Sequence, residues 1–178
     1  YYMDVLSKNA FGNFRDVLEE VTYSSAMARY LTYWRNEKGD PATGRMPDEN
    51  YAREVMQLFT IGVVELNQDG TPKLVNGQQV ETFNNDDVEG LAKVFTGLSW
   101  PGPNFYQESA NSTYKRLVMF DGMHSPEEKR FLGKVIPANT GGDESIKIAL
   151  DTIFEHPNVA PFISRQLIQR FTASSPSP

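Results

Sequence analysis

Residues 47–62 constrain the fold more than any other stretch of this sequence. Asp48 is placed to cap a helix, because its carboxylate can accept backbone N–H groups of the first turn. Gly62 can adopt the left-handed conformation that ends many helices. With residues about 100° apart around the helix axis, one side collects the apolar side chains Tyr51, Ala52, Val55, Met56, Leu58 and Phe59. The pattern predicts a central helix that buries Val55, Met56 and Phe59 against helices at 85–97 and 145–172.

The same helical spacing of apolar residues recurs on both sides of this stretch. It predicts a helix over 9–20, a short helix after Ser24 or Ser25, a helix over 85–97 and two helices within 145–172. Asn76-Gly77 suits a type I′ turn, so residues 73–80 should form a β-hairpin. Residues 114–120 and 131–137 could pair as a second small ribbon. The expected fold is mainly α, an irregular multi-helix bundle with one or two small β-hairpins.

The length of 178 residues is enough for one domain with a sizeable core. We expect a single helical domain over residues 1–172, with residues 173–178 as a tail or the start of a linker. The chain begins Tyr-Tyr-Met and ends Ser-Ser-Pro-Ser-Pro. We therefore expect it to be the C-terminal part of a longer protein.

Composition narrows the classes of partner. The formal net charge is −6 and no long Lys/Arg cluster occurs, which argues against nucleic acid or an anionic membrane as the main partner. The absence of cysteine excludes disulfides, thiolate metal sites and cysteine nucleophiles. No apolar run approaches the ~20 residues that span a bilayer, and no signal peptide is visible in this stretch.

The polar side of the central helix supplies the first candidate site. Glu49 and Arg53 form an i,i+4 pair, and Glu54 projects about 100° further round. An arginine between two carboxylates could hold one of them for metal binding or acid–base chemistry. The same residues could instead form a structural ion-pair network or a solvated helix face. A third interpretation has Arg53 buried between helices, where removing one partner would be costly.

Asp121 and His124 supply the second candidate site, in a stretch expected to be a loop. If Glu49 or Glu54 were brought near, the imidazole and the carboxylates could hold a divalent cation. The metal candidates are therefore Glu49, Glu54, Asp121 and His124, and the catalytic candidates are Glu49, Arg53, Glu54 and His124. The alternative is that His124 is a loop histidine bonded to the backbone. No HExxH, GxSxG, P-loop or GxGxxG motif is present.

Two smaller groups of residues favour structural roles. His156 precedes Pro157 at a predicted helix start, where capping or packing is expected. Five aromatic residues could line a sugar- or peptide-binding cleft, but aromatic side chains more often simply pack. These five are Tyr33, Trp34, Trp100, Phe105 and Tyr106.

Several blocks, in order, resemble the bacterial family known as domain of unknown function 1800. They are residues 9–18, 26–31, 47–62, 87–100, His124 with Lys129 and 131–133, and 156–171. Asp48 stands where the family usually has Asn, and Ser125 where Asp commonly follows His. The resemblance implies an exported protein, periplasmic or extracellular. It also implies a protein partner from a neighbouring gene, of a sulfatase-like family.

Two functions remain open at this point. The first is association with another protein, without catalysis. The second is metal-assisted hydrolysis by the Glu/Asp/His cluster. The sequence leaves open whether the protein is an enzyme, because neither a nucleophile motif nor a recognised metal-ligand spacing occurs.

Overall fold

The computed structural model describes residues 1–176 and is mainly helical, with seven α-helices and three two-stranded antiparallel sheets in that range. The predicted tail at 173–178 is described as far as residue 176, and residues 177 and 178 lie outside the described part. The helices are α1 Tyr2–Lys8, α2 Phe14–Thr22, α3 Ser25–Tyr30, α4 Asn50–Glu54, α5 Asn85–Ala92, α6 Gly142–Phe154 and α7 Val159–Phe171.

The strands pair as three small ribbons. They are β1 Leu74–Val75 with β2 Gln78–Gln79, β3 Leu98–Ser99 with β4 Val118–Met119, and β5 Lys129–Phe131 with β6 Lys134–Ile136. Short helical segments complete the fold: the π-helix η1 Val55–Thr60 and the 3-10 turns η2 Lys93–Phe95, η3 Ser112–Tyr114 and η4 Asp121–Met123.

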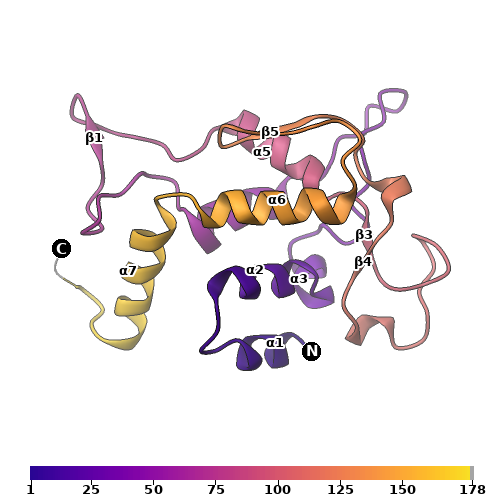
Figure 1. Cartoon of the computed structure of the whole chain (residues 1–178), viewed down its shortest axis with the longest axis horizontal. Coiled ribbons are helices and arrows are strands. Elements are labelled where there is room, and N and C mark those ends of the chain that lie inside the picture. Colours follow the sequence, from indigo (N-terminus) through magenta and orange to yellow (C-terminus); the bar gives the residue numbers. More distant parts are fainter. Residues whose placement is uncertain (177–178) are drawn as a thin grey trace.

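Helix α6 runs across the middle of the molecule (Figure 1). Helix α2 contacts one side of it and α1 lies outside α2, whereas α5 and β5 lie on the other side. Helix α7 leaves the end of α6 at a steep angle and, in this view, runs on the same side of α6 as α2 and α1. A single cluster of buried apolar residues extends from Val5 in α1 to Val159 in α7.

The predicted central helix is present and buried as expected on most of its apolar face. Asp48 accepts the backbone N–H of Asn50 at 2.8 Å, so it does satisfy a first-turn donor, although Glu49 occupies the N-cap position. Gly62 has φ +67° and donates its N–H to Met56 O. Val55 and Met56 are fully buried. The segment contacts α5, α6 and α7, as predicted.

Two apolar residues depart from the prediction: Phe59, expected to be buried, is only partly buried against the core, and 54% of Leu58 is exposed. The second half of the central helix is a π-helix rather than an α-helix. A π turn contains more residues than an α turn. Each residue after Val55 is therefore rotated by less than 100° around the helix axis. The prediction that Leu58 lies on the apolar face was wrong for this reason.

Turn chemistry explains which ribbons form. Asn76 and Gly77 have φ values of +53° and +78°, which confirms the predicted hairpin. The predicted pairing of 114–120 with 131–137 was wrong. Leu132 and Gly133 also have positive φ values, so residues 129–136 close on themselves as a hairpin. β4 pairs instead with β3.

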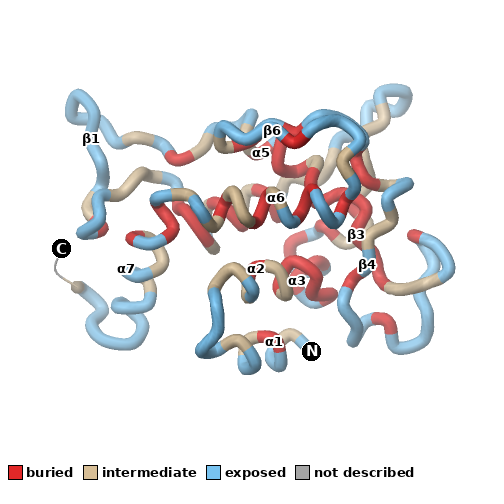
Figure 2. The backbone as a smooth tube through the Cα atoms, viewed as in Figure 1, coloured by how far each residue is buried: buried red, intermediate tan, exposed pale blue. Residues whose placement is uncertain are grey.

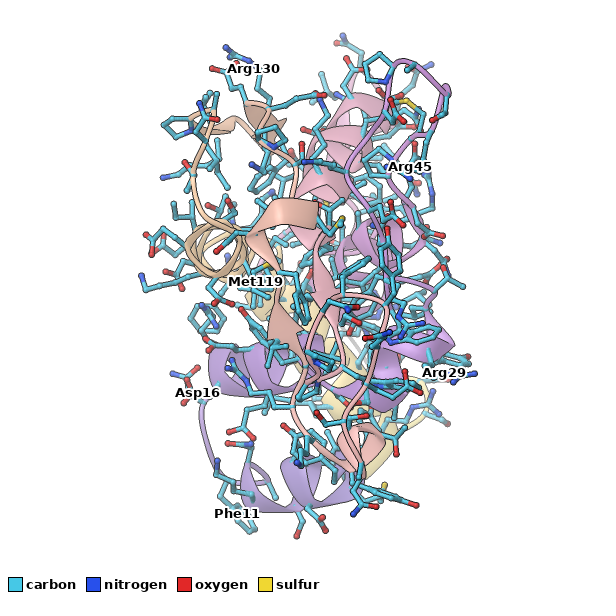
Figure 3. The ribbon with its side chains drawn as sticks, turned by 90° about the vertical axis from the view of Figure 1, so that its right-hand side faces the viewer. Phe11, Asp16, Arg29, Arg45, Met119 and Arg130 are labelled. Atoms are coloured by element: carbon cyan, nitrogen blue, oxygen red, sulfur yellow. The ribbon has the colours of Figure 1, made fainter. Side chains whose placement is uncertain are left out.

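Strand β4 is in turn held against α6. A Cβ added to Gly142, the first residue of α6, would overlap the Met119 side chain. In the view of Figure 3, Met119 lies between Arg130 at one end of the molecule and Phe11 at the other. This contact sets the position of the turn that follows β4, which carries Asp121 and His124.

Other helix ends follow from local signals. Asn84 and Asp87 form a capping box at the start of α5, as the asparagine-rich stretch there predicted. Asn13 caps α2, which therefore begins later than the predicted helix at 9–20. The two helices predicted within 145–172 are confirmed as α6 and α7. No helix within residues 1–176 has the length and apolar character needed to cross a bilayer.

We expect Gly90→Ala to destabilise the protein strongly. Gly90 is buried in α5, and a Cβ there would lie 1.7 Å from the carbonyl oxygen of Arg130 in β5. The backbone cannot yield as a flexible side chain can, so the cost should reach or exceed the upper end of the ~1–3 kcal/mol seen for overpacking. Urea unfolding measures this loss. Gly122→Ala is the matched control, because nothing lies within 4 Å of its added Cβ. Equal stability of the two variants would contradict the α5–β5 contact.

Candidate functional site

Glu49 and Arg53 form the predicted ion pair at the surface. Arg53 Nη2 donates to Glu49 Oε2 at 3.2 Å and to Asn85 Oδ1 at 3.2 Å. Asn85 in turn donates to Glu89 Oε1 at 3.3 Å. The side chains of Arg53 and Glu49 are 40% and 38% exposed. The i,i+4 pair is therefore confirmed as a solvated network joining α4 to the start of α5, and the interpretation with Arg53 buried was wrong.

Glu54 does not join this network. Its Oε2 atom is buried and has no hydrogen-bond partner among residues 1–176. Arg53 is bonded to Glu49 and not to Glu54, so the arginine does not bridge two carboxylates. The two glutamates project from α4 in different directions, as their positions on the helix require.

His124 is buried, and both of its ring nitrogens face protein partners. Nδ1 lies 2.9 Å from the carbonyl oxygen of Thr96, which can only accept, so Nδ1 carries the proton. Nε2 is left as an acceptor for the hydroxyl of Ser145, 3.3 Å away. Burial lowers the pKa of His124 below its usual value, and the charge of Lys129 lowers it further. His124 is thus a neutral histidine that connects η2 to α6.

Asp121 also serves the start of α6. Its Oδ1 atom accepts the N–H of Gly142 at 2.9 Å. A carboxylate is stabilised there by the free N–H groups and the dipole of the helix N-terminus. Asp121 and His124 are therefore brought together, and both attach the η4 turn to α6. The loop interpretation of His124 is confirmed.

The four predicted metal ligands do not assemble. Within residues 1–176, no three His, Asp or Glu side chains are grouped so that they could hold a metal ion. Glu49 and Glu54 project from α4, whereas Asp121 and His124 are bonded at the start of α6. The prediction of one shared divalent-cation site was wrong in this geometry, because the sequence gives no distance between α4 and the η4 turn.

Lys129 belongs to a block of the family resemblance, but the sequence did not single it out as a candidate site residue. It is fully buried, and Nζ donates to the carbonyl oxygens of Ser125 and Glu127 at 2.9 and 3.1 Å. Burial and the neighbouring charge of Lys93 lower the pKa of Lys129. Strand alternation could have found it, since Lys129 and the buried Phe131 point to the same face of β5. Lys129 holds the loop after His124 in place.

The aromatic residues mostly pack in the interior. Tyr33, Trp100 and Phe105 are buried, and the Trp34 ring packs against Trp100 in a tilted arrangement with ring centroids 4.6 Å apart. Of the five residues considered as a cleft, Tyr106 alone is largely exposed. His156 accepts the N–H of Asn158 at 3.1 Å through Nδ1, so its predicted role at the helix start is confirmed.

Comparison of the sequence with models of known protein families assigns the chain to a family. The model for "Protein of unknown function (DUF1800)" matches residues 1–178, the whole chain. The chain belongs to this family. No curated protein and no solved structure matches it significantly. In this DUF1800 chain two of the blocks that carry the resemblance have clear structural roles. Residues 47–62 form the core helix, and His124 with Lys129 fastens a loop between η2 and α6.

Arg53→Ala should change the free energy of unfolding by less than ~1 kcal/mol. The pair with Glu49 is exposed, and such pairs lose most of their Coulomb energy to solvent. Urea unfolding of the variant beside the wild type checks this. A loss of several kcal/mol would mean that Arg53 is buried in solution and would contradict the network described above.

Stability should fall with acid partly because of His124. Its folded pKa lies below the usual 6.5, so the unfolded chain binds the proton first as the pH drops. The contribution is complete above about pH 6.5 and is lost as the pH falls towards the folded pKa. The free energy of unfolding, measured with urea at several pH values, should depend less steeply on pH in His124→Gln than in the wild type. His156→Gln should make this dependence shallower as well, because burial also lowers the pKa of His156. If His124→Gln shows the same dependence of unfolding free energy on pH as the wild type, the lowered pKa of His124 is contradicted.

Proposed function

We propose that this DUF1800 chain acts by associating with another protein, and that α7 provides the contact. One observation carries the proposal: the last turns of α7 leave Leu167, Ile168 and Phe171 exposed by 51%, 43% and 84%. These residues are spaced i, i+1 and i+4, so they share one side of the helix. Figure 2 shows this part of α7 as exposed, beyond the buried contacts of its first turn.

The physical argument concerns the cost of such a surface. Every residue from Leu167 to Phe171 is exposed, so the end of α7 has little tertiary support. Helical segments of this length are marginal in water without packing. Apolar groups gathered on an otherwise polar surface are typical of interaction sites. A partner that covered the stripe would bury apolar area and stabilise the helix at the same time.

The partners of His124, Asp121 and Lys129 also support a structural role over catalysis around the η4 turn. His124 has protein partners at both ring nitrogens, and Asp121 caps α6. Lys129 is enclosed by backbone carbonyl groups. Each group therefore has a sufficient structural role in holding one loop against α6.

The proposal includes export and a partner from a neighbouring gene, of a sulfatase-like family. This part rests on the sequence blocks that resemble the family. Fractionation of the native host tests it directly. Recovery of the protein with the periplasmic or secreted fraction is expected, and recovery with the cytosol would refute export.

Leu167→Ser combined with Phe171→Ser should abolish the association without unfolding the chain, because both positions are exposed. In native-host extracts, size-exclusion chromatography should show the wild type in a larger assembly and the variant at the size of the single chain. Tyr30→Ser is the matched control, since Tyr30 is an aromatic residue 77% exposed on α3. An assembly that survives in the α7 variant would rule out α7 as the contact.

A further inference from the structure

Two hollows adjoin α7 and meet along one of its sides. One, of about 180 Å³, lies between α7 and the 68–71 turn and is lined by Gly70, Thr71, Arg165 and Ile168, among others. The other, of about 490 Å³, lies towards the end of α6 and is lined by Phe14, Phe154, Val159 and Ile163, among others. Ala160 and Ser164 line both hollows. The exposed side of α7 is thus flanked by concave surface.

The residues along this side have the spacing of a helix-packing seam. Ala160, Ser164, Leu167 and Phe171 are all exposed and follow one another at intervals of 4, 3 and 4 residues. This alternation keeps side chains facing a second helix, as at the a and d positions of a coiled coil. The two small residues permit close approach near the hollows, and the two large ones supply apolar area. We call these four residues the α7 seam.

Charge at the α7 seam indicates what kind of helix would pack there. Helix α7 contains no Asp or Glu, although the chain as a whole carries a net charge of −6. Arg170 lies beside the seam at a g-type position, whereas Arg165 lies further round the helix at a b-type position. Arg165 is partly held in place, since Nη1 donates to Gly70 O at 2.7 Å. Residues that flank a seam determine which partner charges are favoured.

Two acidic residues line the hollows, but neither belongs to the seam. Asp69 lines the smaller hollow, but its carboxylate accepts the N–H and hydroxyl of Thr71 at 2.9 and 2.7 Å. Glu155 lines the larger hollow just after α6 ends, before α7 begins. Arg170 is therefore the charged residue of α7 that directly flanks the seam.

We propose that the α7 seam binds an amphipathic helix of a partner protein, apolar on one face and flanked by carboxylates. This inference rests on the proposed function and specifies the partner surface. Packing α7 against a second copy of itself would bring arginines together with no α7 carboxylate to offset them. An anionic membrane is less suitable, since two arginines fall short of the clusters of about 4–8 basic residues typical of such binding.

Two synthetic helical peptides provide the test. Both are about three heptads long with Leu at the a and d positions, and they differ in having Glu or Lys at the flanking positions. Fluorescence anisotropy with the whole chain measures binding. The Glu-flanked peptide should bind at least ~10-fold more tightly at low ionic strength, and the difference should shrink as salt is added.

Variants connect this preference to the seam. Leu167→Ser with Phe171→Ser should lose binding of both peptides, whereas Tyr30→Ser should bind as the wild type does. Arg170→Glu should reduce or reverse the preference for the Glu-flanked peptide. Circular dichroism of each variant confirms that the helical content is retained.

The inference is overturned if neither peptide binds, or if both bind equally well. It is also overturned if sedimentation equilibrium shows a dimer that Phe171→Ser dissociates, which would make a second copy the occupant. Binding to phosphatidylglycerol vesicles without binding to either peptide would identify a membrane surface instead. If neither peptide binds, or both bind equally well, while the α7 variant still loses its native assembly, the proposed association stands and only the partner chemistry is wrong.

Discussion

Three aromatic rings in mutual contact join distant segments at the centre of this fold. Tyr33 and Tyr51 are stacked with ring centroids 4.1 Å apart, and Phe95 meets Tyr51 edge-on at 4.7 Å. All three are buried. Such ring pairs contribute roughly 0.5–1.5 kcal/mol each beyond the area that they bury. Because they come from the chain after α3, from α4 and from η2, the stack joins segments that are distant in sequence.

Burying two phenol groups requires partners for their hydroxyls, and Thr22 supplies both. Tyr33 donates to the carbonyl oxygen of Thr22 at 2.8 Å, and Tyr51 bonds to its side-chain hydroxyl at 2.8 Å. Burial raises the pKa of both tyrosines, so they stay neutral donors. The end of α2 is thereby locked to α4. This orientation of α4 turns Glu49 and Arg53 to the solvent.

A second polar contact directs α7 and so produces the surface to which we assign the function. Asn158 donates to the carbonyl oxygens of Ile61 and Val64 at 2.6 and 2.9 Å and accepts the N–H of Leu66 at 2.6 Å. It joins the start of α7 to the end of the central helix. Phe162 packs over Gly62, where a Cβ would overlap its ring. Only the first half of α7 is anchored in this way, and the second half extends into solvent.

The sequence by itself determined the features that depend on residues close together in the chain. These include the capping of α5, the Asn76-Gly77 hairpin, the end of the central helix at Gly62 and the Glu49–Arg53 pair. The family assignment also came from sequence blocks alone. Each depends on contacts within a few residues, whose geometry is set by backbone preferences and helical spacing.

Tertiary structure decided the rest. The π turn moved Leu58 out of the core, and strand pairing buried Lys129. The separation of Glu49 and Glu54 from His124 depends on contacts between distant parts of the chain, because α4 packs against α5 whereas the η4 turn is bonded to the start of α6. The exposure of Leu167 and Phe171 depends on the direction that Asn158 gives to α7. These outcomes depend on contacts between residues that are far apart in the sequence. The spacing of residue types within one segment does not determine which faces of different segments meet.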